Sequence, residues 1–217
     1  MSATGEGDFA RRPIAVLDYG IGNLGSVAKA LAAIGAPARL VTGAEDPSSF
    51  SGVVLPGVGA FGACARELRR YGFDEVVMGA LAQGIPLLGV CVGLQLLFEG
   101  SEESPDAKGL GVLPGLIRRF ECELPIPQMQ WNRLRLTGLG KASPLFAGLG
   151  AEPWMYFVHS YAAPLVPETS ATADYCGEFT AGIERGNLFA TQFHPEKSSS
   201  VGLALLANFA RIAAGSE

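Results

Sequence analysis

A cysteine stands where a buried strand is expected to end and a helix to begin. Residues 89–93 read Gly-Val-Cys-Val-Gly, between the apolar run 85–88 and the apolar run 94–98. The flanking glycines suit the sharp, strained turn that lifts a nucleophile above the end of a strand. Such a turn aims the sulfur of Cys91 at the positive end of the helix, which favours a thiolate. Cys91 is therefore the candidate nucleophile.

A histidine and a carboxylate near the end of the chain complete this chemistry. Residues 192–196 read Gln-Phe-His-Pro-Glu. His194 can act as general base and acid near neutral pH, and Glu196 can accept a hydrogen bond from its other ring nitrogen. Together with Cys91 they predict a triad that attacks an acyl carbon. For His159, which stands among aromatic residues, a structural role is at least as well supported as a functional one.

The tetrahedral intermediate of acyl transfer carries an oxyanion that needs two hydrogen-bond donors. The backbone N–H of Val92, the first residue of the expected helix, is one candidate. The other donor should come from a neighbouring loop with exposed amides. The segment Pro-Gly-Val-Gly at 56–59 fits, because its glycines allow a close approach of the backbone.

Composition limits the classes of protein to which the chain can belong. Its 217 residues, 48% of them hydrophobic, predict a single domain over residues 1–217 with a flexible start at 1–12. A net charge of −5 argues against a nucleic-acid partner. No apolar stretch approaches the ~20 residues of a membrane span, and the N-terminus lacks the apolar core of a signal peptide. We therefore expect a cytoplasmic protein with no nucleic-acid or membrane partner.

Four cysteines, at positions 64, 91, 122 and 176, include no C-x-x-C pair, and the chain has two histidines. This pattern lacks the spacing of a zinc site, so no metal is expected. Without a signal peptide all four cysteines are expected to be reduced, which agrees with a cytoplasmic location. All but Cys91 are interpreted as packing residues.

The first half of the chain alternates between short apolar runs and segments with helical spacing. This alternation predicts an α/β fold with an open, mostly parallel sheet flanked by helices on both faces. The expected strands are 13–19, 38–41, 52–55 and 85–90, and the expected helices are 24–34, 60–71 and 73–83.

The second half, after a polar surface loop at 101–107, is richer in extended segments. Its strands are expected to be antiparallel and to extend the same sheet. The expected elements are extended segments 111–119, 131–136, 154–161 and 171–175, a hairpin over 179–193 turning at 185–187, and a closing helix 201–213.

Chemistry in open α/β sheets gathers at the carboxyl ends of the strands. Residues 19–20, the segment 56–59, Cys91 and His194 all directly follow expected strands. We therefore expect these four places to meet at one edge of the sheet.

These motifs resemble the triad-type (class I) glutamine amidotransferases, whose fold is flavodoxin-like. Within that class the chain resembles the glutaminase subunit of imidazole glycerol phosphate synthase, over roughly residues 13–212 with the motifs in order. The motifs that carry the resemblance are Gly-Val-Cys-Val-Gly-Leu-Gln (89–95), Asp-Tyr-Gly-Ile-Gly-Asn (18–23), Pro-Gly-Val-Gly-Ala-Phe (56–61), Tyr-Phe-Val-His-Ser-Tyr (156–161) and Thr-Gln-Phe-His-Pro-Glu-Lys-Ser (191–198).

The resemblance implies hydrolysis of L-glutamine to glutamate and ammonia through a γ-glutamyl thioester, with Cys91, His194 and Glu196 as the triad. It implies no metal and no organic cofactor. The other matching positions are Val92, Val58 and Gly57 for the oxyanion hole, Gly59, Gln95, Ser160 and Tyr161 for the substrate, and Asn23, Tyr156 and Lys197 for the partner interface.

In this family the ammonia passes to a (β/α)8-barrel cyclase subunit, so the resemblance implies a heterodimer. There the ammonia reacts with a phosphoribulosyl-formimino intermediate, giving imidazole glycerol phosphate for histidine biosynthesis and an aminoimidazole carboxamide ribotide. The resemblance also suggests that the Gly57–Val58 peptide turns its N–H away from the oxyanion site until the partner binds. The isolated chain is then expected to hydrolyse glutamine slowly.

One segment departs from the family pattern. Where members typically carry Val-Pro-His-Met-Gly-Trp-Asn, residues 126–132 read Ile-Pro-Gln-Met-Gln-Trp-Asn. Gln130 adds a long polar side chain near the expected partner surface, which leaves open a paralogous subunit that feeds ammonia to a different synthase. A γ-glutamyl peptidase with the same triad and a non-catalytic module on a flavodoxin-like sheet are further alternatives. The segment 18–23 argues against the peptidase, and the complete triad argues against the binding module.

Overall fold

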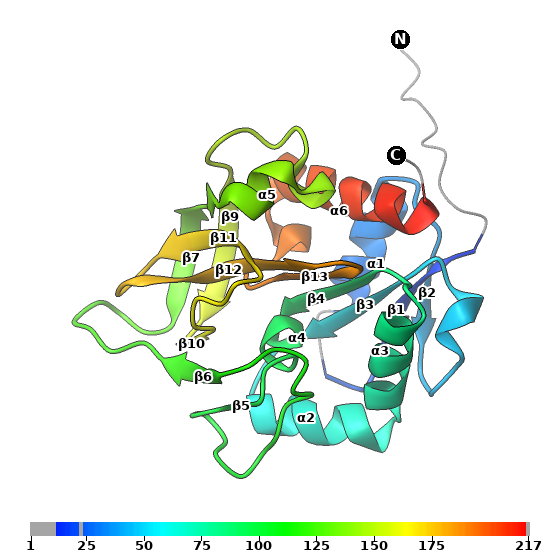
Figure 1. Ribbon diagram of the computed structural model, residues 1–217, viewed down its shortest axis with the longest axis horizontal. Helices are drawn as coiled ribbons and strands as arrows, with labels where there is room; N and C mark the ends of the chain where they lie inside the picture. Colours follow the sequence, from blue (N-terminus) through cyan, green and yellow to red (C-terminus); the bar gives the residue numbers. More distant parts are fainter. Residues whose placement is uncertain (1–11, 22–23, 216–217) are drawn as a thin grey trace.

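The computed structural model describes residues 12–21 and 24–215, and an eight-stranded sheet forms its centre (Figure 1). The strands of this sheet are β1 Ile14–Leu17, β2 Ala38–Val41, β3 Gly52–Gly57, β4 Leu87–Cys91, β8 Arg135–Leu136, β11 Thr169–Asp174, β12 Glu178–Arg185 and β13 Leu188–Thr191. Their order is β2-β1-β3-β4-β13-β12-β11-β8. The first five strands in this order, from β2 to β13, run parallel to one another.

Helices cover both faces of the parallel strands. α1 (Leu24–Ala33) and α6 (Ser199–Ala214) pack together on one face, while α2 (Phe61–Arg70) and α3 (Phe73–Ala82) lie on the other (Figure 1). The chain steps in opposite directions across the sheet from β1 to β2 and from β3 to β4. Right-handed crossovers therefore place the connecting helices on opposite faces. The α/β fold expected from the sequence is confirmed.

Burial explains the composition of these strands. All residues of β1, β3, β4 and β13 are buried, as parallel strands covered on both faces must be. The largest fully buried side chains include Tyr19, Phe50, Phe61, Phe73, Phe98, Phe157, Phe193 and Phe209.

The C-terminal strands extend the same sheet in antiparallel fashion. β13 pairs with β12, β12 with β11, and β11 with β8, all antiparallel. β12 and β13 form the expected hairpin, and Gly186 in its turn has a φ of 60°. The antiparallel extension of a mostly parallel sheet is thus also confirmed.

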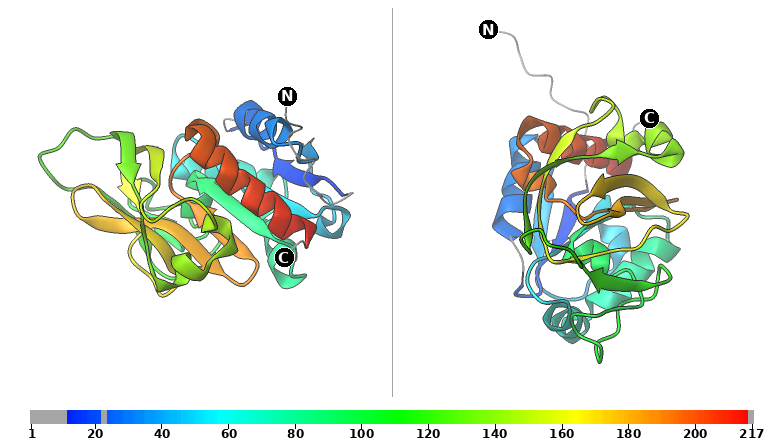
Figure 2. Two further views of the ribbon diagram at one scale, coloured as in Figure 1. Left: turned by 90° about the horizontal axis from the view of Figure 1, so that it is seen from above. Right: turned by 90° about the vertical axis from the view of Figure 1, so that its left-hand side faces the viewer.

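Two smaller sheets lie beside the antiparallel strands, toward the same end of the molecule (Figure 2). β7 (Gln128–Arg133) and β9 (Trp154–His159) form an antiparallel ribbon, and β10 (Tyr161–Ala162), β6 (Leu116–Arg119) and β5 (Gly100–Ser101) form a three-stranded sheet. The expectation that 111–119, 131–133 and 154–161 join the central sheet is therefore wrong. Strand periodicity shows which face is buried but not which strand is the neighbour.

Two local predictions are also corrected. Residues 111–115 are not a strand, and Gly111 and Gly115 in this loop have φ values of 64° and 106°. The short helix α5 (Gly138–Ala142) was not expected, because its glycine-rich sequence is poor in helix formers. Its start is capped by Thr137, whose Oγ1 accepts the N–H of Gly140 at 3.2 Å.

Cys122 and Cys176, which are 54 positions apart in sequence, form a disulfide with their Cα atoms 5.5 Å apart. The expectation that all four cysteines are reduced is wrong for this pair. The loop before β7 and the turn between β11 and β12 bring the two together, which spacing along the chain does not reveal. Cys64 and Cys91 are free and buried.

Some predictions fall outside the described residues. Asn23 and the expected flexible start, apart from Arg12, lie there. Within residues 12–21 and 24–215, no helix has the length and apolar character needed to cross a membrane.

Candidate active site

Cys91 stands at the tip of a strained elbow. It ends β4 and precedes the short helix α4 (Val92–Gln95), with a φ of 55° and a ψ of −110°. Non-glycine residues rarely adopt positive φ, and such strain concentrates at functional sites. A Cβ on Gly57 would lie 2.8 Å from the Gly93 nitrogen, and a Cβ on Gly93 would lie 1.9 Å from the Leu55 carbonyl oxygen. Glycine at these two positions lets β3 and α4 approach closely enough to form the elbow.

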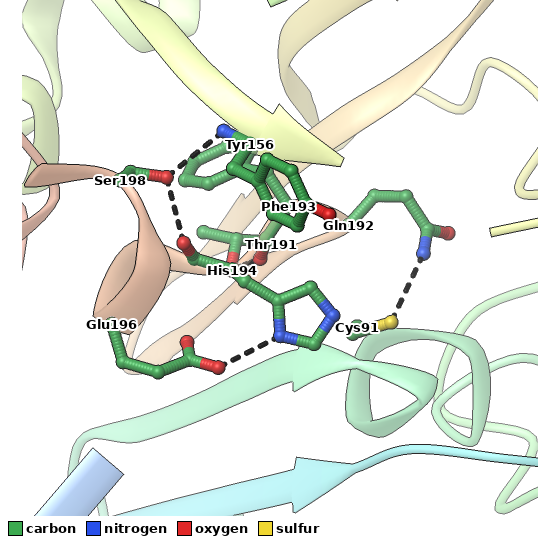
Figure 3. A network of polar contacts seen from close by, with 8 residues as sticks. All are labelled: Cys91, Tyr156, Thr191, Gln192, Phe193, His194, Glu196 and Ser198. Carbon is green, nitrogen blue, oxygen red and sulfur yellow. Dashed lines mark hydrogen bonds and ion pairs between the residues drawn. The ribbon is translucent and has the colours of Figure 1, made fainter. Parts of the chain in front are cut away.

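His194 follows β13 and turns its ring toward Cys91 (Figure 3). Its Nδ1 lies 2.8 Å from Oε1 of Glu196, and the two side chains are 2% and 1% exposed. Pro195 opens the 3-10 turn η3 (Pro195–Lys197), which brings the carboxylate back beneath the ring. The other ring nitrogen, Nε2, faces the sulfur of Cys91. The structure thus brings the three residues of the predicted triad together.

The charge on His194 is set by its neighbours. Burial by itself lowers the pKa of His194, but the adjacent Cys91 sulfur and the Glu196 carboxylate outweigh burial and raise that pKa to about 10. At neutral pH the imidazole of His194 therefore carries a proton and can act as a general acid.

Three hydrogen bonds connect the triad histidine with β9, and Figure 3 shows the two that involve Ser198. The His194 N–H donates to the Tyr156 carbonyl at 3.0 Å, and the Tyr156 N–H donates to Oγ of Ser198 at 3.0 Å. The Ser198 hydroxyl donates in turn to the His194 carbonyl at 2.7 Å. The ribbon and the histidine are therefore held as one unit.

The segment after β3 runs beside the elbow. The Tyr19 hydroxyl donates to the carbonyl that precedes Gly57, and the Cys64 thiol donates to the Val58 carbonyl at 3.4 Å. Both donors are fully buried, so they hold the carbonyls of this segment toward the core. Val58 and Val92 line the same cavity, as two oxyanion donors must.

A cavity of about 650 Å³ opens over Cys91, which is within the usual range for small-molecule sites. Three described residues with predicted roles do not line this cavity. Glu196 lies behind His194, Gly57 lies against the elbow, and Tyr156 lies on the β7–β9 ribbon. The residues predicted from the sequence that line the cavity are Val58, Gly59, Cys91, Val92, Gln95, Ser160, Tyr161, His194 and Lys197.

Several residues of the site had no predicted role. Ala60, Glu103, Pro127 and Val158 also line the cavity. Glu103 lies in the segment expected to be a plain surface loop, yet its Oε2 accepts the N–H at the start of α2 at 2.7 Å. The sequence does not indicate this contact, because Glu103 and the start of α2 are 42 positions apart along the chain.

His159 is a neutral residue in the wall of the cavity. Burial lowers the pKa of His159 to about 4, and its Nδ1 donates to the Tyr161 carbonyl at 2.8 Å. Gln128 lies opposite His159 in the β7–β9 ladder and is fully buried. Within the described structure, the side-chain nitrogen and oxygen of Gln128 have no hydrogen-bond partner. The same is true of Nε2 of His159. His159 packs against aromatic side chains and also lines the cavity. The structure is therefore compatible with both a structural and a functional role for it.

The arrangement is suited to acyl transfer from an amide. It combines a cysteine sulfur on a strained elbow, a protonated imidazole turned toward that sulfur and a carboxylate that holds the ring. The thiolate can attack a carbonyl carbon, and the imidazolium can protonate the nitrogen that leaves. Within the described ranges, no group of three or more histidine, cysteine, aspartate or glutamate residues is placed to hold a metal ion.

Comparison with known protein families gives a match over most of the chain. The family model described as "Glutamine amidotransferase class-I" matches residues 15–213. The imidazole glycerol phosphate synthase subunit HisH of Deinococcus radiodurans is 48% identical over 202 residues, covering 91% of this chain and 93% of the relative. The subunits of the same name from a Synechococcus strain and from Moorella thermoacetica are 48% and 43% identical, each covering 93% of this chain and 94% and 95% of the relative.

Solved structures share the fold at lower sequence identity. One, described as a glutamine amidotransferase, superposes with a TM-score of 0.69 at 20% identity, covering 93% of this chain and 98% of its own. The structure of PurLQS from Thermotoga maritima gives a TM-score of 0.68 at 17% identity, covering 93% of this chain and 97% of its own. At this level of identity the likeness concerns the fold alone.

Proposed function

The chain belongs to the class I glutamine amidotransferase family, and from this premise we propose that it is the glutaminase subunit of an imidazole glycerol phosphate synthase. It hydrolyses L-glutamine to glutamate and ammonia, and the synthase uses the ammonia in histidine biosynthesis. Relatives that match it along nearly their whole length carry the name of this subunit. The structural observation that supports the proposal is the triad: Cys91 and His194 line one cavity, the His194 ring faces the sulfur, and Glu196 lies 2.8 Å behind that ring.

The reaction starts when the Cys91 sulfur attacks the side-chain amide carbon of glutamine. The C–S bond forms as the carbonyl becomes an oxyanion, which the N–H groups of Val92 and Val58 stabilise. His194 gives its Nε2 proton to the amide nitrogen, the C–N bond breaks and ammonia leaves. Water then attacks the thioester and gives a proton back to His194. The Cys91 thiolate leaves, and glutamate is released.

Gln95 helps to hold the amino-acid end of the substrate. Its Nε2 already donates to the Tyr161 carbonyl at 3.0 Å and to Oε1 of Gln192 at 3.1 Å. Gln95 therefore has only its carbonyl oxygen to offer a ligand, which suits the α-ammonium group of glutamine. Ser160 and Tyr161 line the cavity beside it.

The cyclase partner docks on the β7–β9 ribbon in this proposal. Met129, Trp131 and Trp154 are 63%, 44% and 51% exposed on one face of the ribbon. Exposed aromatic and methionine side chains are enriched at protein interfaces. A hydrogen bond connects β9 of this ribbon directly to His194 of the triad. Lys197 lines the cavity.

Gln130 does not lie on that face. Side chains alternate along a strand, so Gln130 projects to the opposite side of the ribbon from Met129 and Trp131. It lines a surface hollow together with Leu124, Cys176 and Met129 of the docking face. The departure from the family pattern at this position therefore borders the proposed docking face but does not lie on it.

The experiment that tests the proposal measures glutamate release by Cys91→Ser in the presence of the cyclase subunit. We expect glutaminase activity to be lost while the circular dichroism spectrum and partner binding stay intact. The matched control is the double variant Cys122→Ser/Cys176→Ser, which removes two sulfurs outside the cavity and is expected to keep its activity. Full glutaminase activity in Cys91→Ser would overturn the proposal.

A further inference from the structure

We propose that Gln192 is a positioning residue for the nucleophile: its side-chain amide donates a hydrogen bond to the Cys91 sulfur and stabilises the negative charge that the sulfur carries during the reaction. The inference rests on the proposed function, because it assigns a role within the same reaction. Gln192 belongs to the segment that carries His194, yet sequence reasoning gave it no role of its own.

Gln192 is buried between the end of β13 and the elbow. Its backbone N–H donates to the Ala181 carbonyl at 2.9 Å, which fixes it to β12, and its side chain is fully buried. Its Nε2 lies 3.8 Å from Sγ of Cys91. Figure 3 shows that the amide approaches the sulfur from a different side than His194 does.

A backbone carbonyl fixes which atom of Gln192 faces the sulfur. The Tyr161 carbonyl oxygen can only accept, so the Gln95 atom 3.0 Å from it is the donor Nε2. The same Gln95 Nε2 lies 3.1 Å from the Gln192 amide, so the Gln192 atom facing it is the acceptor Oε1. The remaining amide atom of Gln192 is then Nε2, and this N–H points at Cys91.

In this arrangement the Cys91 sulfur faces two nitrogens with different chemical capacities, Nε2 of His194 and Nε2 of Gln192. His194 carries the proton that is passed to the leaving nitrogen, and it is neutral once ammonia has formed. Gln192 cannot transfer a proton, so its N–H stays on the sulfur through both halves of the reaction. It therefore stabilises the thiolate both when it attacks and when it leaves the thioester.

The amide pair also connects the nucleophile with the substrate cradle. Gln95 is 3% exposed and bonds both to Gln192 and to the carbonyl of Tyr161, a residue that lines the cavity. An apolar side chain of the same size would fill the space of Gln192 equally well. The side chain of Gln192 does more than fill space, because its N–H donates to the Cys91 sulfur and its oxygen accepts from the buried amide of Gln95.

The test is the pH dependence of Cys91 alkylation by iodoacetamide, followed by mass spectrometry of the peptide that contains Cys91. Gln192→Met keeps the length of the side chain and removes the donor. We expect the midpoint of the alkylation profile to rise by about one pH unit. Alkylation below the midpoint should slow about tenfold. The value of kcat should fall with it.

Thr191→Val is the matched control. Thr191 is the neighbouring residue, is equally buried and uses its hydroxyl on the Phe193 carbonyl at 3.1 Å. The Thr191→Val variant is expected to keep the wild-type midpoint of Cys91 alkylation. Gln192→Glu is a second variant of the same shape, which keeps an acceptor for Gln95 and replaces the donor by an oxygen. It is expected to raise the midpoint further, and it tests the proposal where Gln192→Met does not fold.

Each outcome separates this proposal from the proposed function. If folded Gln192 variants keep the wild-type midpoint, the inference is overturned, even where kcat falls, because the loss then reflects packing. The proposed function fails on a different result, which is full glutaminase activity in Cys91→Ser. A raised midpoint in both Gln192 variants with an unchanged midpoint in Thr191→Val supports the assignment.

Discussion

Replacing Glu196 by glutamine separates the charge of the triad carboxylate from its position. In Glu196→Gln the side chain keeps its length and an oxygen that can accept from Nδ1 of His194. What it loses is the negative charge, in a place where the two side chains are 1% and 2% exposed and lie 2.8 Å apart. Water screens such a buried contact only weakly, so the effect of the charge should be measurable.

The magnitude follows from the kind of hydrogen bond that is lost. Bonds to charged groups contribute about 1.5–3 kcal/mol and neutral ones about 0.5–1.5 kcal/mol, so the change costs about 1–2 kcal/mol. At about 1.4 kcal/mol per factor of ten, kcat/KM should fall about 5- to 30-fold. The Glu196 charge also helps to raise the pKa of His194 to about 10. Without it the imidazolium loses its proton at a lower pH, so the high-pH limb of the profile should move toward neutral.

The assay is glutamate release by the chain with its cyclase subunit, measured from about pH 6 to about pH 11 to cover both limbs. Glu67→Gln is the control, since Glu67 pairs with Arg70 in an exposed salt bridge and should leave the profile unchanged. If Glu196→Gln keeps both the wild-type kcat/KM and the wild-type high-pH limb, the electrostatic role assigned to Glu196 is refuted.

Three further outcomes are expected. Gln128→Met should raise the unfolding free energy in urea by about 1 kcal/mol, because the buried amide has no partner within the described structure; a clear loss of stability would contradict this. Reducing the Cys122–Cys176 disulfide should lower that free energy by about 2–4 kcal/mol, and thiol titration of the unfolded chain should count two thiols before reduction and four after it. Four thiols before reduction would agree instead with a reduced cytoplasmic protein. Gly57→Ala should abolish glutaminase activity, because its Cβ would lie 2.8 Å from the Gly93 nitrogen; wild-type turnover would refute the close approach.

The elbow and the triad were predictable because their signals are local. Glycines around Cys91 and a proline between His194 and Glu196 restrict the backbone within a few residues. The alternation of strands and helices then brings these places to one end of a parallel sheet. The positions around the cavity were reached through family resemblance, which supplied Gln95, Ser160 and Tyr161.

The remaining features depend on contacts between distant segments. The disulfide joins Cys122 to Cys176, and the ribbon of β7 and β9 pairs away from the central sheet. The amide chain from Gln95 to Gln192 spans 97 positions. Each of these depends on which segments meet in three dimensions. Composition and periodicity describe one segment at a time and carry no such information.

The central claim is that this chain is a glutaminase that works with a cyclase subunit. The most direct test is glutamine hydrolysis by the purified chain, alone and with an imidazole glycerol phosphate cyclase barrel and its nucleotide ligand. We expect slow turnover alone and strong stimulation by the barrel, through the ribbon that is bonded to His194. Fast turnover that does not respond to the barrel would contradict the claim and point to a glutaminase that serves a different synthase.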